Sequence, residues 1–366
     1  MDDIEKLVLN KINDLKEEII EFHQKIVQIP SQIPPGKYRP ISKFVAEKMK
    51  EIGINTEIKR NNVIGEIGNG NGRSLIFNAH LDTYAIHDGW TKDPYKAEII
   101  DNKIYGRGSS DDKACIAAEI FAAKALIDAG IELNGKLILT GVVNEEIGGL
   151  GSGYLLDEGL ITGDACLLGD VSCDYPVAYR GGVLQVSFTI TGIRRHSMSY
   201  PDLPPPNRNK FSGINAIHKM SEIIKYLFDL QEKFNMTETK YPILPDLPSK
   251  ISSVTITKIE GGTSFSTIPD KCSLHCLISI IPELNFEDIK SHILNFIKEI
   301  EENDTNLRIS VQMPVQIDPQ ITDINTDFAK KVKNAFKTVL MKRENSSYLS
   351  LQVMHIYFSK RVLKLF

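Results

Sequence analysis

The stretch LIFNAHLDTYAIHDGWTKDPYKAEIIDNKIYGRGSSDD, residues 75–112, determines how the rest of the chain is interpreted. Its apolar start, residues 75–79, predicts a buried β-strand. His80 and Asp82 follow where this strand ends, and their spacing of two puts both side chains on one side of an extended segment. One of them can therefore bind a metal ion while the other orients its neighbour or stabilises charge. A strand end with polar caps is the alternative interpretation.

A glycine-rich turn closes this stretch. It reads Tyr105-Gly-Arg-Gly-Ser-Ser-Asp-Asp112 and opens an alanine-rich helical run over residues 113–129. The paired carboxylates of Asp111 and Asp112 have two interpretations. Aspartate is common at the N-cap of a helix, so both side chains can cap the run. They can also face the polar groups that follow the strand before them.

Two further apolar strands end in carboxylates. Residues 136–143 lead into Glu145 and Glu146, and residues 165–168 stop just before Asp170. In open α/β sheets the ligand crevice lies outside the carboxyl ends of the strands, so we expect these polar groups to converge. Crowded carboxylates repel one another, and one or two divalent cations remove that cost. One histidine with several carboxylates suits zinc, cobalt or manganese.

The order of these motifs resembles a known family. His-Leu-Asp-Thr, Gly-Arg-Gly-Ser-Ser-Asp-Asp-Lys, Asn-Glu-Glu-Ile-Gly-Gly and Gly-Asp are similar to motifs of the di-zinc amidohydrolases and exopeptidases. That family includes acetylornithine deacetylase, succinyl-diaminopimelate desuccinylase, aminoacylase and the glutamate-releasing carboxypeptidase. The resemblance covers residues 29–282 approximately. It implies a hydrolase that cleaves the amide bond of N-acyl amino acids or small peptides.

The resemblance also implies a role for each motif residue. The two zinc ions, for which cobalt or manganese are possible substitutes, would be bound by His80, Asp111, Glu146 and Asp170, with Asp111 shared by both. Asp82 would sit behind His80, and Glu145 would be the general base. The peptide bond between Asp111 and Asp112 would be cis.

The sequence changes character after Asp170. Alternating and helical patterns predict the order β-α-β-β-α-β, a two-layer ferredoxin-like unit, with elements at 183–191, 214–230, 251–258, 271–281, 286–300 and 307–313. We therefore expect an α/β protein: a mostly parallel-sheet catalytic domain with helices on both faces (1–182 and 316–366) and an inserted lid and dimerisation domain (183–315). An exposed sheet edge on such a lid favours a homodimer.

The predicted lid carries one further candidate. Gly192-Ile-Arg-Arg-His196-Ser resembles the family motif Gly-x-x-x-His-Ser. The resemblance implies that His196 reaches an active site, often that of the partner subunit, and donates to the oxyanion of the intermediate. Ser266 and Ser279 stand where the family usually has asparagine and arginine, which leaves the recognition of the substrate carboxylate open.

Composition limits the partners. The chain has 366 residues, enough for two domains, a net charge of −4 and 25% charged residues. This charge gives no basic field for nucleic acid and no attraction to anionic membranes. The acidic start, the lack of a membrane-length apolar run and five scattered cysteines favour a cytoplasmic protein. The family resemblance implies that its substrate is a small N-acyl amino acid or peptide.

The last residues leave an alternative. Residues 342–366 contain neither the aspartate-rich turn nor the histidine that the family would use to complete the second zinc site. His355 lies in an apolar run typical of a strand or helix with a buried imidazole. A catalytically impaired family member, acting as a binding or assembly partner, is therefore the second hypothesis. A glycosidase-like use of Glu145 and Glu146 is a third, although adjacent residues seldom flank a bond from opposite faces.

Overall fold

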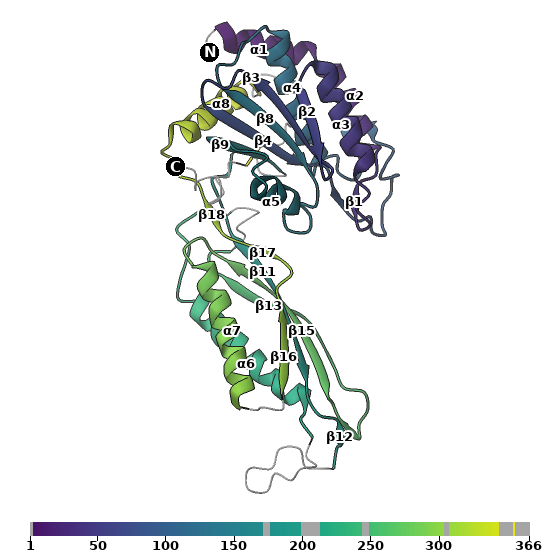
Figure 1. Ribbon diagram of the computed structural model, residues 1–366, viewed down its shortest axis with the longest axis vertical. Helices are drawn as coiled ribbons and strands as arrows, with labels where there is room; N and C mark the ends of the chain where they lie inside the picture. The colour runs from purple at the N-terminus through teal and green to yellow at the C-terminus, as the bar shows by residue number, and fades with distance from the viewer. Residues whose placement is uncertain are drawn as a thin grey trace. The chain divides into compact units, whose positions relative to one another are not determined.

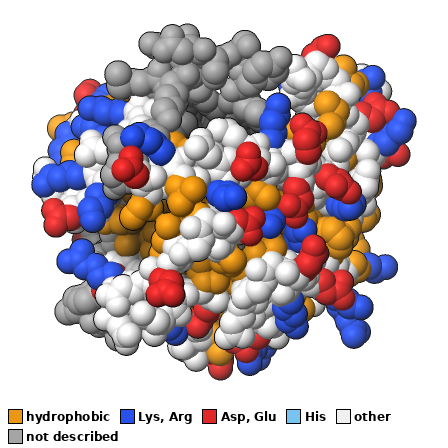
Figure 2. Space-filling model, turned by 90° about the horizontal axis from the view of Figure 1, so that it is seen from above, with side chains coloured by type: hydrophobic (Ala, Val, Ile, Leu, Met, Phe, Trp, Pro, Cys, Tyr) orange, Lys and Arg blue, Asp and Glu red, His pale blue; other side chains and the backbone are white. Residues whose placement is uncertain are grey.

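The computed structural model describes residues 3–170, 176–198, 213–243, 249–303, 307–343 and 354–355 (Figure 1). The chain forms two compact units. Unit 1 comprises Met1–Ala178 and Ile321–Phe366, and unit 2 comprises Tyr179–Gln320. Within the described ranges no helix has both the length and the apolar character needed to cross a membrane. Acidic and basic side chains are interspersed over the face seen in Figure 2.

Unit 1 is built on a six-stranded sheet. Its strands, in spatial order, are β19 (Met354–His355), β9 (Ala165–Gly169), β4 (Ser74–His80), β8 (Lys136–Val142), β3 (Asn62–Gly68) and β2 (Asn55–Lys59). The pairs β4–β8 and β4–β9 are parallel, and the other three pairs are antiparallel. The predicted α/β class is confirmed. The sheet is mixed, however, with parallel pairing only in its centre.

A tight hairpin explains one antiparallel pair. β2 and β3 are joined by Arg60 and Asn61, whose φ angles are 48° and 68°. Two successive residues with positive φ form the turn that matches the twist of paired antiparallel strands. The strands β4, β8 and β9 are instead connected through helices, which parallel neighbours require.

Helices cover both faces of this sheet, as predicted. They are α1 (Asp3–Asp14), α2 (Lys16–Val27), α3 (Arg39–Ile52), α4 (Lys113–Asp128), α5 (Leu150–Asp157) and α8 (Asp327–Arg343). Side chains of a strand alternate between the two faces. Leu137 and Leu139 of β8 pack with the cluster formed by α2, α3 and α4, whereas Ile138 packs with Leu155 of α5.

Unit 2 has the predicted ferredoxin-like order. β11 (Gly182–Thr191), α6 (Ala216–Phe234), β13 (Ser253–Gly261), β15 (Lys271–Ile280), α7 (Phe286–Asn303) and β16 (Arg308–Gln312) follow one another along the chain. The strands form an antiparallel sheet in the order β13-β15-β11-β16, and β17 (Gln316–Ile317) also pairs with β11. Alternate residues of β11, such as Leu184 and Phe188, are fully buried in a core that α6 and α7 complete.

Four short strand pairs complete the description. They are β1 (Gln32–Ile33) with β5 (Thr83–Tyr84), β6 (Glu98–Ile100) with β7 (Lys103–Tyr105), β10 (Tyr179–Arg180) with β18 (Gln320–Ile321), and β12 (Arg195–His196) with β14 (Thr267–Ile268). The loop that contains Trp90 lies between β5 and the β6–β7 pair. This stretch connects β4 to α4.

Helix α4 buries a carboxyl group that no ion pair compensates among the described residues. Glu119 is 3% exposed, and its Oε1 has no hydrogen-bond partner in the described structure. Burial, followed by the nearby Asp112, raises the pKa of Glu119 well above its usual range. The folded protein therefore keeps a proton that the unfolded chain releases near pH 4.5.

This burial predicts a stabilising substitution. Glu119→Met should raise the free energy of unfolding by about 1–3 kcal/mol, because an apolar side chain of similar length replaces an unpartnered polar group. The gain should be larger at pH 8 than at pH 5, since wild-type stability falls as pH rises from the unfolded pKa toward the raised folded pKa. Urea unfolding at both pH values measures this. Glu47→Met, at an exposed position of α3, is the control and should change neither value.

Candidate metal centre

His80 is the last residue of β4 and is only 3% exposed. Its backbone N–H donates to Asp112 Oδ2 at 2.9 Å, and its Nδ1 lies 2.9 Å from the backbone oxygen of Asp82. A carbonyl can only accept, so Nδ1 carries the proton. Nε2, 2.9 Å from Asp111 Oδ1, is then the nitrogen whose lone pair is available to a metal ion.

Three of the predicted ligands converge in space. His80, Asp111 and Asp170 each offer one ligand atom, and these atoms lie within 4.8 Å of one another. The sheet explains why: β4 and β9 are parallel neighbours, with Asn78 opposite Leu168, so the residues two positions further along each chain leave the sheet at the same edge.

The side chains of Asp111 and Asp112, in the turn before α4, lie in different environments. The Asp111–Asp112 peptide bond is cis, as the family resemblance implies. The Asp111 side chain is 44% exposed, whereas Asp112 is fully buried. Asp112 occupies the N-cap of α4 but makes no side-chain capping hydrogen bond there. It accepts the His80 N–H instead, so simple helix capping does not account for this pair.

Asp82 joins the ends of two strands. It is fully buried, and its two oxygens accept the backbone N–H groups of Glu145 at 3.1 Å and Glu146 at 3.2 Å. One of these oxygens also lies 3.6 Å from His80 Nδ1. The turn after β8 is thereby fixed beside His80, and Glu145 Oε2 lies 4.0 Å from His80 Nε2.

The charges at this site conflict when no cation is present. Burial, together with the neighbouring Asp111, raises the pKa of Glu146 to about 7. Burial by itself lowers the pKa of His80, but hydrogen bonds with Asp111 and Asp82 outweigh that effect and raise it well above its usual range. Both groups bind protons because several carboxylates lie close together. A divalent cation could replace these protons as the positive charge that offsets the repulsion between the carboxylates. The donor set therefore fits a metal ion.

His196 and His355 lie elsewhere in the chain. His196 belongs to unit 2, in the exposed β12, where its Nδ1 accepts the N–H of Met198 at 3.3 Å. Its proposed contact with the oxyanion stays a prediction. The backbone of His355 is in β19, paired opposite Leu168 of β9, so this part of the final segment is a strand.

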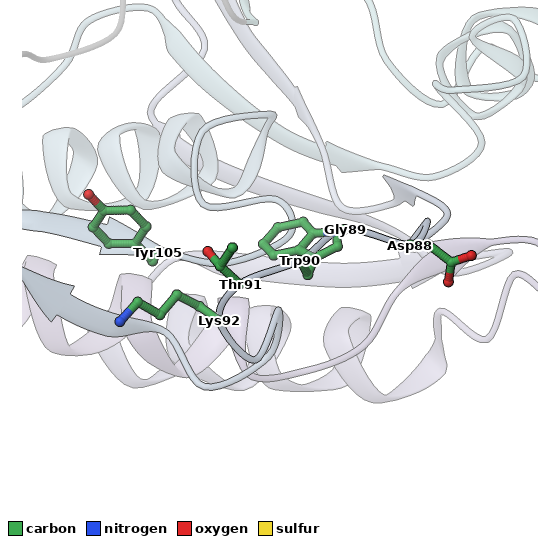
Figure 3. A pocket seen from close by; sticks show the side chains of 6 residues that line it. All are labelled: Asp88, Gly89, Trp90, Thr91, Lys92 and Tyr105. Atoms are coloured by element: carbon green, nitrogen blue, oxygen red, sulfur yellow. The ribbon is translucent and has the colours of Figure 1, made fainter.

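A shallow pocket of about 310 Å³ lies in the loop after β5. It is lined by Asp88, Gly89, Trp90, Thr91, Lys92 and Tyr105 (Figure 3). Arg107 fixes this loop: its guanidinium lies 5.3 Å from the centre of the Trp90 ring and donates to the oxygen of Ala85 at 3.0 Å. The loop is thus held against the segment that leads to Asp111.

Two features of the centre were not found from the sequence. The role of Asp112 as acceptor for the His80 N–H is one. The other is the hydrogen bond from the Tyr38 hydroxyl to Asn144 Oδ1 at 2.6 Å. Nothing in the sequence signals a contact across more than one hundred residues.

The fold and this centre define an α/β protein with an acidic, histidine-containing metal site. The chain belongs to peptidase family M20/M25/M40, whose model matches residues 76–354. Members of this family are metal-dependent hydrolases, typically with two metal ions. The match extends beyond the motifs recognised in the sequence and reaches β19.

Individual relatives agree with this assignment. N-formyl-4-amino-5-aminomethyl-2-methylpyrimidine deformylase of Halalkalibacterium halodurans is 28% identical over 313 residues, covering 82% of this chain and 70% of the relative. Acetylornithine deacetylase of Photorhabdus laumondii is 30% identical over 255 residues, covering 67% and 62%. A dinuclear metal-binding M20 peptidase of Bacillus subtilis shares the fold, with a TM-score of 0.59, 15% identity and coverage of 89% and 81%.

The position of Asp82 predicts the effect of a conservative substitution. Asp82→Asn should lower metal affinity by about 10–100-fold, because an amide has one acceptor oxygen and cannot replace both carboxylate oxygens that accept the N–H groups of Glu145 and Glu146. Zinc titration against a competing chelator measures this. Asp164→Asn is the matched control: one oxygen of Asp164 accepts both Ser74 contacts at the opposite end of β4, so the amide can retain them. Equal metal affinity in both variants would contradict the assigned role of Asp82.

Proposed function

We propose that this protein is a zinc-dependent hydrolase that cleaves the amide bond of N-acyl amino acids or small peptides. The observation that carries this proposal is the convergence of His80, Asp111 and Asp170, with Glu145 Oε2 4.0 Å from the histidine. The relatives named as a deformylase and a deacetylase support an acyl group bound to an amine as the substrate class.

The cluster of His80, Asp111 and Asp170 supports part of the ligand set, and the family resemblance supports adding Glu146. His80 and Asp170 would hold one zinc, Glu146 the second, and Asp111 both; cobalt or manganese suit the same donors. A bound zinc ion would polarise the scissile carbonyl and lower the pKa of a water molecule toward neutrality.

The remaining steps belong to residues of this chain. Glu145 accepts a proton from the attacking water as the new carbon–oxygen bond forms, and it delivers that proton to the amine as the carbon–nitrogen bond breaks. Asp82 holds the backbone of Glu145 in place for both transfers. His196 would donate an N–H to the negative charge that develops on the carbonyl oxygen, often in the active site of the partner subunit, as the family resemblance implies.

The proposal predicts how one substitution separates binding from turnover. Glu145→Gln should keep the metal content but lower kcat by at least about 100-fold, because the amide cannot accept the proton. The measurements are metal analysis and hydrolysis of a panel of N-formyl, N-acetyl and N-succinyl amino acids and dipeptides, with and without a chelator. Glu132→Gln, outside the metal centre, is the control.

Two results of this experiment would reject the hydrolase. Turnover of Glu145→Gln at the wild-type rate would remove Glu145 as the base. A metal-loaded wild-type protein that hydrolyses no member of the panel would instead favour the catalytically impaired binding partner suggested by residues 342–366.

We also propose a homodimer formed through unit 2. Its edge strand β13 has no second strand neighbour among the described residues and exposes Ile259 to 50%. An exposed edge of this kind can pair with that of another subunit. A cytoplasmic location is proposed as well, since Cys115, Cys166, Cys272 and Cys276 are all free thiols.

The dimer predicts a change in mass. Ile259→Lys should shift the protein from dimer to monomer, because a charge would be buried at the pairing edge. Sedimentation velocity over a range of concentrations measures this. Ile58→Lys, on the edge strand β2 of unit 1, is the matched control and should leave the mass unchanged. A wild-type protein that is monomeric throughout would rule out the dimer.

A further inference from the structure

Tyr38 lies far in sequence from the motifs of the metal centre. Its side chain nevertheless contacts the turn that carries Glu145 and Glu146. Its hydroxyl donates to Asn144 Oδ1 at 2.6 Å, and Asn144 directly precedes Glu145. Tyr38 is 5% exposed and stands at the N-cap of α3, where its carbonyl accepts the N–H of Ser42. The phenol therefore reaches the turn from a fixed backbone position.

The turn after β8 has an unusual backbone. Asn144 has a φ of 61°, in the left-handed region that residues other than glycine rarely adopt. Asparagine tolerates this region better than most other residues that carry a side chain. The Asn144 carbonyl accepts the N–H of Leu150, and the Glu145 carbonyl accepts those of Gly148 and Gly149. The direction in which both glutamate side chains leave the strand depends on the conformation of Asn144.

Two anchors hold this turn from opposite ends of one short segment. Asp82 accepts the N–H groups of Glu145 and Glu146, and Tyr38 holds the side chain of the residue before them. We propose that Tyr38, acting through Asn144, is a positioning residue that aligns Glu145 and Glu146 in the metal centre. The expected effect on turnover rests on the proposed function. The expected effect on the conformation of the turn does not.

The local surroundings suit a permanent donor at this position. Burial, and then the negative charge of Asp82, raises the pKa of Tyr38 to about 12, so the hydroxyl keeps its proton at any working pH. Gly36 packs directly against the phenol, since a Cβ at that position would lie 3.1 Å from the hydroxyl oxygen. A larger residue there would push the ring away from Asn144.

Kinetics provide the first test. Tyr38→Phe should lower kcat about tenfold with KM changed less than twofold, because small displacements of a reacting group affect the chemical step. Asn144→Gly should have a similar effect, since glycine accepts the same φ but lacks the acceptor. The double variant should be no worse than either single variant, as expected for two partners in one interaction. Multiplying effects would show that the two residues act independently.

Tyr95→Phe is the matched control for loss of a buried hydroxyl. The Tyr95 hydroxyl is buried in the same unit and has no hydrogen-bond partner in the described structure. Its removal should leave kcat and KM close to the wild type. A tenfold loss in Tyr95→Phe would mean that deletion of any buried phenol oxygen in unit 1 disturbs the centre, and would overturn the specific role of Tyr38.

Hydrogen exchange provides a second test that needs no activity. In Tyr38→Phe, peptides covering residues 143–149 should exchange faster than in the wild type, whereas Tyr95→Phe should leave them unchanged. Unaltered exchange in Tyr38→Phe would overturn the inference whatever the kinetics show. If the wild type hydrolyses no substrate but exchange rises in Tyr38→Phe, the proposed hydrolase fails while the positioning role of Tyr38 stands.

Discussion

The metal centre depends on the hydrogen bonds of one buried carboxylate. Asp82 has no exposure to solvent, and each of its oxygens accepts a backbone N–H from the turn after β8. A buried carboxylate is unfavourable unless its oxygens are satisfied, so this turn and the end of β4 stabilise each other. The pairing of β4 with β8 places the two strand ends side by side, and the hydrogen bonds of Asp82 then fix the turn with Glu145 and Glu146 relative to His80.

Two buried ionisable residues lie at the start of α4, beside the centre. Lys113 is fully buried, and its ammonium donates to the backbone oxygen of Ile29 at 2.8 Å. Burial lowers the pKa of Lys113 to about 7. Asp112 lies next to it in the chain and is also fully buried, with its pKa raised well above the usual range by burial. Polar side chains therefore occupy buried positions at the start of α4 where apolar side chains would be more stable, as is common near functional sites.

Hydrophobic periodicity and strand ends predicted most of this structure. The alternation in residues 183–191 and the helical spacing in 286–300 gave the ferredoxin-like order, because both patterns depend on residues close in sequence. The convergence at His80 and Asp170 followed from a topological rule about parallel strands. The sheet is mixed because three of its pairs, β2–β3, β3–β8 and β9–β19, are antiparallel. Only the first of these follows from a local turn, at Arg60 and Asn61.

Contacts between distant segments could not be predicted in this way. The Tyr38 hydroxyl meets Asn144 only after the loop before α3 and the turn after β8 have packed together. The different environments of Asp111 and Asp112 depend on backbone geometry that two identical residues do not reveal.

The insertion of unit 2 imposes an order on biosynthesis. Unit 2 is one continuous segment, whereas unit 1 is interrupted and receives α8 and β19 only afterwards. A nascent chain emerges from the ribosome N-terminus first, so His80, Asp111, Glu146 and Asp170 are all available before the inserted segment is made. The strand β19, which pairs with β9, is made only after unit 2. The donor atoms can thus be assembled early, whereas β19 joins the sheet that supports them only after the inserted segment has been made.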